Sequence, residues 1–162
     1  GTVYVNAYLD RETVEKLEVT LMVHDANEEE NKPQIATTTL IVTLLDVNDN
    51  DPIFITNEHA DYYETNVSEN ANNPTILMSV SATDKDRNRT ITYGINNSTL
   101  NDSVFTINPI TGELSKSGQV DREETSTVIL TVIATDNGYP PRSSSIEVLI
   151  TILDFNDNTP QF

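Results

Sequence analysis

The 162 residues, enough for one or two domains that each bury a core, include 26 acidic and 9 basic side chains and carry a formal net charge of −17 at pH 7. This acidic balance repels phosphate backbones and anionic membrane surfaces, so it excludes nucleic acid as a partner and favours cations. The chain has no cysteines, which excludes disulfides and thiolate metal sites.

Residues 1–50 contain two runs in which apolar and polar side chains alternate, the two-residue period of a β-strand. The apolar face of the first run carries Leu17, Val19, Leu21 and Val23. That of the second run carries Leu40, Val42 and Leu44. The second run leads into LLDVNDNDPIF at residues 44–54, where Asp and Asn side chains gather just before a proline. The sequence therefore predicts two strands followed by an oxygen-rich segment.

The rest of the chain predicts about seven short strands, rich in β-branched and aromatic residues and separated by Asn, Gly and Pro. They cover residues 61–67, 75–83, 90–95, 104–107, 112–117, 127–136 and 145–154. The last two again alternate, with inward faces made of Val128, Leu130, Val132, Ala134, Ile146, Val148, Ile150 and Ile152. No helical stripe competes with them, so the fold class is all-β, and this many short strands indicate a Greek-key sandwich.

The sequence repeats itself with the period of a whole domain. The matching pairs are Gly1 with Gly112, Asp10 with Asp121, Asp25 with Asp136, and Asp46 with Asp154. The first three pairs lie 111 positions apart and the last 108, because one loop is three residues longer in the first copy. Residues 1–50 therefore hold the second half of one repeat, and residues 51–162 hold one complete repeat.

The oxygen-rich segment carries the ligand types that Ca²⁺ prefers, although scattered acids are often only a solvated surface. Asp46, Asn48 and Asn50 match positions 1, 3 and 5 of a helix-loop-helix calcium loop, but its glycine at position 6 is replaced by Asp51 and strands flank the segment. A second run at 84–88 fails in the same way. A calcium site must therefore be assembled from several loops, and spacing alone does not say which loops meet.

Five motifs, in their order and spacing, resemble cadherin repeats over essentially the whole chain. They are LDRE at 9–12, DVNDNDPIF at 46–54, ATDKD at 82–86, TGELSKSGQVDRE at 111–123 and VIATDNG at 132–138. The resemblance implies seven-stranded Greek-key β-sandwiches in tandem, the first present only as its C-terminal half. It also implies three calcium ions between successive repeats.

The resemblance also implies which residues bind calcium, because the calcium-binding residues of cadherins can be assigned to the matching positions of this sequence. The resemblance assigns the outermost ion to Asp10, Glu12 and Asp49, and the middle ion to Glu12, Asp46, the Val47 carbonyl, Asp49 and Asp86. It assigns the third ion to Asn48, the Asn50 carbonyl, Asp84, Asp86, the Asn88 carbonyl and Asp136. A second, incomplete cluster is expected from Glu69, Asp121, Glu123, Asp154, Asn156, Asp157 and Asn158.

Acceptor motifs for N-glycosylation indicate an extracellular or cell-surface location. The candidate acceptors are Asn66, Asn96, Asn97 and Asn101. Asn88 also fits the pattern, but the resemblance assigns its carbonyl to calcium. No long apolar run or signal peptide occurs, so a membrane anchor, as in a single-pass cadherin, is expected outside this fragment.

The expected function is calcium-rigidified cell-cell adhesion or recognition, with neighbouring cadherin repeats and a homophilic or heterophilic cadherin as partners. The alternative is a force-bearing tether or a receptor segment for a secreted ligand, in which stiffness matters more than self-binding. An enzyme or a sugar-binding module is not expected, because the sequence offers no catalytic set. His24 and His59, the two histidines, fall on an outer strand face and in a polar loop.

Overall fold

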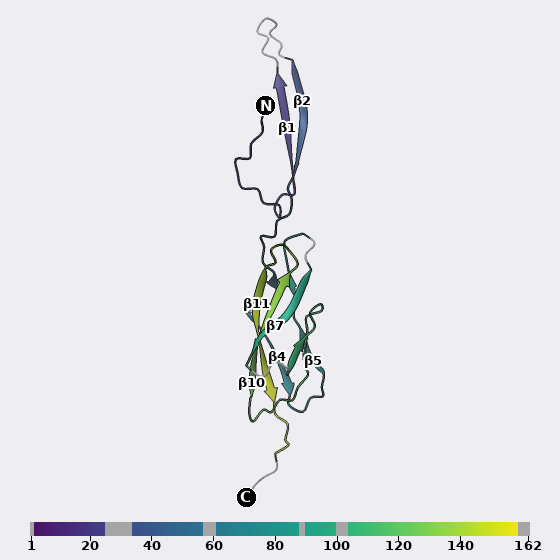
Figure 1. Ribbon diagram of the computed structural model, residues 1–162, viewed down its shortest axis with the longest axis vertical. Coiled ribbons are helices and arrows are strands. Elements are labelled where there is room, and N and C mark those ends of the chain that lie inside the picture. The colour runs from purple at the N-terminus through teal and green to yellow at the C-terminus, as the bar shows by residue number, and fades with distance from the viewer. Residues whose placement is uncertain (1, 25–33, 57–60, 88–89, 100–103, 159–162) are drawn as a thin grey trace. The chain divides into compact units, whose positions relative to one another are not determined.

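The structure, a computed structural model, describes residues 2–24, 34–56, 61–87, 90–99 and 104–158. The chain divides into two compact units, residues 1–47 and 48–162. The division falls inside the oxygen-rich segment, three residues before the repeat boundary predicted at residue 50. The described residues form strands and turns without an α-helix (Figure 1), as the alternating patterns predict. They therefore include no helix that is long and apolar enough to span a membrane.

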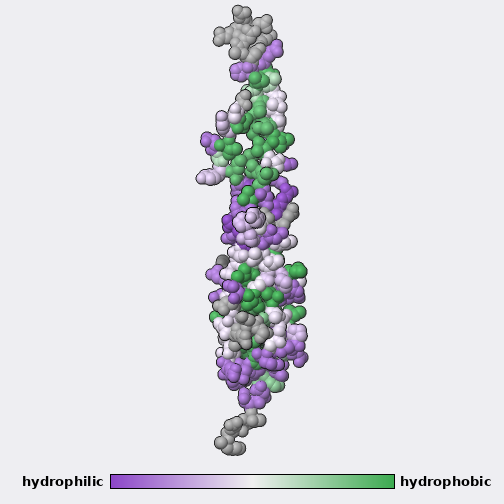
Figure 2. Space-filling view, in the orientation of Figure 1, coloured by the Kyte–Doolittle hydropathy of each residue, from purple (hydrophilic) through white to green (hydrophobic). Residues whose placement is uncertain are grey.

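The first unit contains one antiparallel hairpin of β1 (Lys16–His24) and β2 (Ile35–Thr43), in which Leu21 lies opposite Thr38. Its predicted inner face is open to solvent, since Val19, Leu21 and Val23 are 38%, 37% and 65% exposed. Figure 2 shows hydrophobic side chains gathered over this unit. Val3, Leu21 and Ala36 are among the residues that line a hollow of about 520 Å³ on it. The strands were predicted correctly, but the described part of the unit leaves their apolar face uncovered.

The second unit contains a strand at each predicted position. The strands are β3 (Ile53–Phe54), β4 (Tyr62–Ser68), β5 (Thr75–Ser79), β6 (Ala82–Thr83), β7 (Ile91–Ser98), β8 (Phe105–Ile107), β9 (Glu113–Lys116), β10 (Thr127–Asp136) and β11 (Ser143–Leu153). The single strand expected at 75–83 is interrupted after Ser79. There the backbone N–H of Val80 donates to Gly112 and the Ser81 carbonyl accepts from Ile55, so this chain segment leaves one partner and joins another.

Two sheets face each other in this unit. One has the order β4-β11-β10-β7, the other β5-β9-β8, and β3 pairs separately with β6. The long hairpin of β10 and β11 occupies the centre of the larger sheet. β4 runs parallel to β11, although the two strands are far apart in sequence. A parallel pair cannot be joined by a tight turn. The chain between β4 and β11 alternates between the sheets, since β5, β8 and β9 belong to the second sheet while β7 and β10 belong to the first, and this arrangement makes the unit a sandwich.

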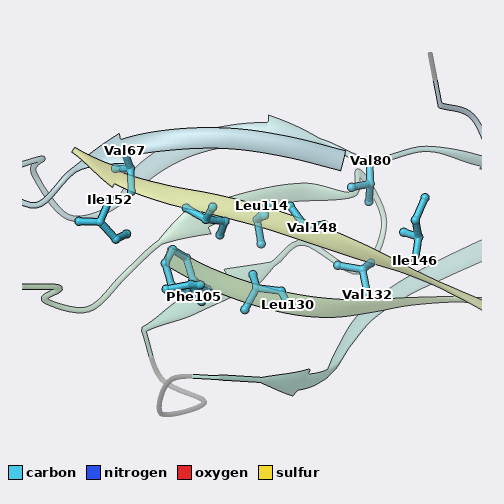
Figure 3. Packing of buried hydrophobic residues seen from close by; sticks show 11 residues of the cluster. Val67, Val80, Phe105, Leu114, Leu130, Val132, Ile146, Val148 and Ile152 are labelled. Carbon is cyan, nitrogen blue, oxygen red and sulfur yellow. The ribbon is translucent and has the colours of Figure 1, made fainter. Parts of the chain in front are cut away.

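The core confirms the predicted inward faces. Val128, Leu130, Val132 and Ala134 on β10 are fully buried, as are Val148 and Ile150 on β11. Except for Ala134, these residues pack in one cluster with Val67, Phe105 and Leu114 from other strands and with Val80, which follows β5 (Figure 3). Burial of such a set is the main stabilising term of the unit, since each fully buried aliphatic side chain contributes about 1.5–3 kcal/mol relative to exposure.

One cation lies in this otherwise apolar interior. The Lys116 side chain at the end of β9 is fully buried. Its ammonium donates to the Ala71 carbonyl at 2.9 Å and to Asn73 Oδ1 at 3.0 Å. Burial lowers the pKa of Lys116, because the interior disfavours the charged form. These two bonds tie the loop before β5 to the core.

Candidate metal centre

Asn48 and Asp136 build one wall of the candidate site in the second unit. Asp136 ends β10 and is 4% exposed, while Asn48 belongs to the oxygen-rich segment and is 6% exposed. The Asn48 amide Nδ2 donates to both carboxylate oxygens of Asp136 at 3.2 Å and to the Pro140 carbonyl at 2.6 Å. Asp136 Oδ1 also accepts from the backbone of Gly138 and Arg142, so it closes the turn between β10 and β11.

Asp84 and Asp86 provide a second contact with the oxygen-rich segment, at Asn50. They lie just after β6, and Asp86 is 5% exposed. The Asp86 carboxylate accepts from the backbone N–H of Asn50 at 3.1 Å and from its side-chain amide at 2.7 Å. Asp84 Oδ1 accepts from the backbone N–H of Asp86 at 2.8 Å. The same oxygen-rich segment is thus held by two loops that are distant in sequence.

Two buried oxygens of this site have no hydrogen-bond donor. They are Asn48 Oδ1 and Asp84 Oδ2. A buried acceptor left unpaired costs about 1–3 kcal/mol, and such groups in native proteins call for a specific explanation. A hard cation would satisfy both, since Ca²⁺ coordinates carboxylate and amide oxygens. The donor set is all oxygen and the two open acceptors belong to residues predicted as its ligands, so the site fits calcium.

Five of the six predicted third-ion residues lie in this arrangement, namely Asn48, Asn50, Asp84, Asp86 and Asp136. Asn88 lies outside the described residues. Asp49, predicted for the other two ions, is exposed and accepts from Asn50 Nδ2 at 2.8 Å.

Sequence reasoning missed Arg142 beside this site. Its Nε donates to the Asn48 carbonyl at 3.1 Å and its Nη1 contacts Asp51 Oδ1 at 2.7 Å. The hydrogen bond to Asp51 raises the pKa of Arg142. The arginine therefore fastens the oxygen-rich segment to the turn that follows β10. No repeated motif marks it, since the matching position 108 residues earlier holds Gln34.

In the first unit the Asp-Arg-Glu motif forms a compact turn. Asp10 Oδ1 accepts from the backbone of Glu12 at 3.0 Å, and Asp10 Oδ2 accepts from the Thr13 hydroxyl at 2.7 Å. The Thr13 hydrogen bond lowers the pKa of Asp10. Arg11, which the sequence reading passed over, contacts Glu12 and reaches Asp46 Oδ1 at 2.7 Å. Two predicted ligands of this unit, Glu12 and Asp46, therefore contact one arginine. Val47, which follows Asp46, is exposed.

The predicted distal cluster forms in part. Ligand oxygens of Glu69, Asp121 and Glu123 all lie within 4.8 Å of one another. Glu69 is 6% exposed and accepts from the backbone of Arg122 at 2.7 Å and of Phe155 at 2.6 Å.

The other four predicted members of that cluster, Asp154, Asn156, Asp157 and Asn158, are exposed. Of these, Asp154 is held by Arg122, whose Nε lies 2.9 Å from Asp154 Oδ1. This hydrogen bond and the charge of Asp154 raise the pKa of Arg122.

The remaining candidates that the structure describes lie on strands. Asn66 on β4 and Asn96 on β7 are exposed, as glycosylation requires, and Asn97 also belongs to β7. His24 is exposed at the end of β1. Asn101 and His59 lie outside the described residues.

Comparison with known proteins agrees with the fold and with the family that the sequence motifs resemble. A family model described as "Cadherin domain" matches residues 63–153. The chain is 36% identical over 156 residues to protocadherin Fat 4 of Mus musculus, covering 95% of the chain and 3% of that protein. It is 41% identical over 135 residues to protocadherin alpha-3 of Homo sapiens, covering 80% of the chain and 14% of that protein. The chain therefore spans only a small part of these relatives.

Solved structures show the same likeness. A protocadherin gammaB7 EC3-6 cis-dimer structure superposes with a TM-score of 0.83 and 30% identity, over 96% of this chain and 36% of that one. Mouse cadherin-23 EC22-24 superposes with a TM-score of 0.80 and 32% identity, over 94% of this chain and 47% of that one.

Proposed function

The chain belongs to the cadherin family, and from this premise we propose that it is an extracellular module of calcium-dependent cell-cell adhesion or recognition. The two open acceptors, Asn48 Oδ1 and Asp84 Oδ2, carry this proposal. They share a buried site with the carboxylates of Asp86 and Asp136. An all-oxygen site of this kind is suited to binding a divalent cation such as Ca²⁺.

The proposal assigns a role to each residue of the third-ion site. Asn48, Asp84, Asp86 and Asp136 would hold the ion through side-chain oxygens, and Asn50 and Asn88 through carbonyls. Bound calcium would supply positive charge to these carboxylates. Arg142 holds the Asn48 backbone at the turn after β10.

The outer two ions of the proposal would be bound by the other residues that the family resemblance assigns. These ligands are Asp10, Glu12, Asp46, Val47, Asp49 and Asp86. Two like charges about 4 Å apart repel by about 4 kcal/mol at an effective dielectric of 20, so acids gathered without an ion favour a splayed linker. Calcium reverses the sign of this interaction and would make the linker between repeats stiff.

A calcium titration of the full chain tests this proposal. We expect binding with a dissociation constant of about 10⁻⁴ to 10⁻³ M, the range of extracellular calcium modules. The melting temperature should rise with calcium and stay unchanged with equal magnesium, since Mg²⁺ demands a tighter octahedral shell. No binding up to about 10 mM calcium would refute the calcium role.

The family relation supports an extracellular or cell-surface location. The exposure of Asn66 and Asn96 supports these two residues as glycan acceptors. The family relation also supports other cadherin repeats as partners, because one solved relative is titled a cis-dimer. A force-bearing tether or a receptor segment remains the alternative. Self-association in sedimentation at millimolar calcium would favour a homophilic adhesive module over the tether or receptor segment.

A further inference from the structure

Both copies of the Asp-Arg-Glu motif place the arginine on acids that the proposed function assigns to calcium. In the first unit Arg11 contacts Glu12 and lies 2.7 Å from Asp46 Oδ1. In the second unit Arg122 lies 2.6 Å from Glu123 Oε1 and 2.9 Å from Asp154 Oδ1. The same three-residue arrangement therefore recurs 111 positions later, in a separate compact unit.

In the second copy of the motif, Arg122 contacts a third acid, Glu69. Besides its two side-chain contacts, the backbone N–H of Arg122 donates to Glu69 Oε2 at 2.7 Å. Oxygens of Glu69 and Glu123 also lie within 4.8 Å of Asp121, as a metal cluster requires. One arginine thus touches three acids of the predicted distal cluster.

We propose that Arg11 and Arg122 are internal counter-cations, which hold the calcium-ligand carboxylates together in the ion-free protein and set a higher calcium threshold. A guanidinium satisfies carboxylates through several fixed donors, so it neutralises part of their mutual repulsion. Calcium requires the same oxygens at 2.3–2.6 Å and brings two positive charges beside the guanidinium. Binding therefore costs the release or displacement of the arginine.

The exposure of the second copy permits this exchange. The Arg122 side chain is 36% exposed and the Asp154 side chain 63% exposed, so the guanidinium can move into water. Exposed ion pairs of this kind contribute little to stability, and a divalent ion bound by several oxygens outcompetes them. An arginine that only supported the turn would behave differently, because its loss would disorder the ligands and weaken calcium binding.

The test is a calorimetric calcium titration of the full chain with Arg11→Gln, Arg11→Lys and Lys16→Gln. We expect Arg11→Gln to bind calcium about 3- to 10-fold more tightly, because a competing charge is gone. Arg11→Lys keeps the charge and should stay near wild type. Lys16→Gln removes an exposed cation of the same unit outside the motif and should change the affinity by less than about two-fold. Unchanged or weaker binding by Arg11→Gln would overturn the proposal.

A second measurement separates this inference from the proposed function on which it rests. In chelator, Arg122→Gln should melt about 1–2 °C below wild type, a small loss as expected for an exposed pair, because the carboxylates of the second unit lose their counter-charge. If the wild-type chain binds no calcium, the proposed function fails, and this melt still decides whether the arginine stabilises the acids. An unchanged melting temperature in chelator would contradict it.

Discussion

The side-chain amide of Asn48 donates to both carboxylate oxygens of Asp136, 88 residues further along the chain. Both side chains are buried, so this pair joins the start of the second unit to the end of β10. Asn48, the first residue of the second unit, is thereby fixed to Asp136, which ends β10 in the hairpin of β10 and β11.

The first prediction concerns this pair. Asn48→Ala should lower the free energy of unfolding by about 1–3 kcal/mol in chelator, since the Asp136 carboxylate and the Pro140 carbonyl lose a buried donor. Asn156 occupies the matching position of the next motif and is exposed. Asn156→Ala should therefore stay within about 0.5 kcal/mol of wild type. Urea denaturation measures both, and equal losses would show that the Asn48 contacts do not stabilise the unit.

The second prediction concerns linker stiffness. Asp86→Ala should loosen the chain in calcium, because Asp86 is assigned to two of the three proposed ions. Small-angle X-ray scattering at millimolar calcium should then give a broader distribution of interatomic distances. Asp25→Ala is the control, since Asp25 is the repeat equivalent of Asp136 but has no assigned ion here, and it lies outside the described residues. A similar broadening in both variants would argue against the assignment of Asp86.

The third prediction uses the internal repeat. Val132 on β10 is fully buried, and Leu21 on β1, its equivalent 111 positions earlier, is 37% exposed. Val132→Ala should destabilise the second unit by about 1–3 kcal/mol, because it leaves a cavity. Leu21→Ala should change the unfolding free energy by less than about 1 kcal/mol, since little packing is lost. A large loss from Leu21→Ala in urea denaturation would mean that another segment covers the β1 face in solution.

The fourth prediction is a pH dependence that arises from Lys116. Burial lowers its pKa below the usual value of 10.5, so the unfolded chain binds this proton more tightly than the folded chain. The contribution of this group to stability therefore rises as pH increases from the folded-state pKa toward 10.5.

Lys116→Met should remove that rise, measured as unfolding free energies in urea at several alkaline pH values. Lys16→Met provides the matched control, because Lys16 is exposed and should leave the slope unchanged. A slope that persists in Lys116→Met would assign the effect to other groups.

Much of the fold follows from the sequence. Strict alternation across 128–134 identifies a strand and its buried face, because a strand has only two faces and a one-residue shift would expose every apolar side chain. The interruption at Val80 was not predicted. Its cause is a change of hydrogen-bond partner from Gly112 to Ile55, which depends on residues distant in sequence.

The site was less accessible to sequence reasoning. Spacing supplied the ligand types, but Asn48 and Asp136 meet only through the fold, so their grouping came from the family resemblance. Arg11 and Arg122 were missed although a signal existed, since both repeats keep an arginine between the two acids. A basic residue between predicted cation ligands marks a place where charge must be compensated.

The parallel pairing of β4 with β11 has a mechanical consequence. Tyr62 lies opposite Glu147 and Ser68 opposite Leu153, so the strand near the start of the second unit and its last strand run side by side in one direction. Tension along the polypeptide pulls β4 toward its N-terminal end and β11 toward its C-terminal end. The hydrogen bonds between β4 and β11 are then loaded in shear and all at the same time, so the whole ladder of bonds must break at once. A hairpin that is pulled apart from its open end instead loses one hydrogen bond after another.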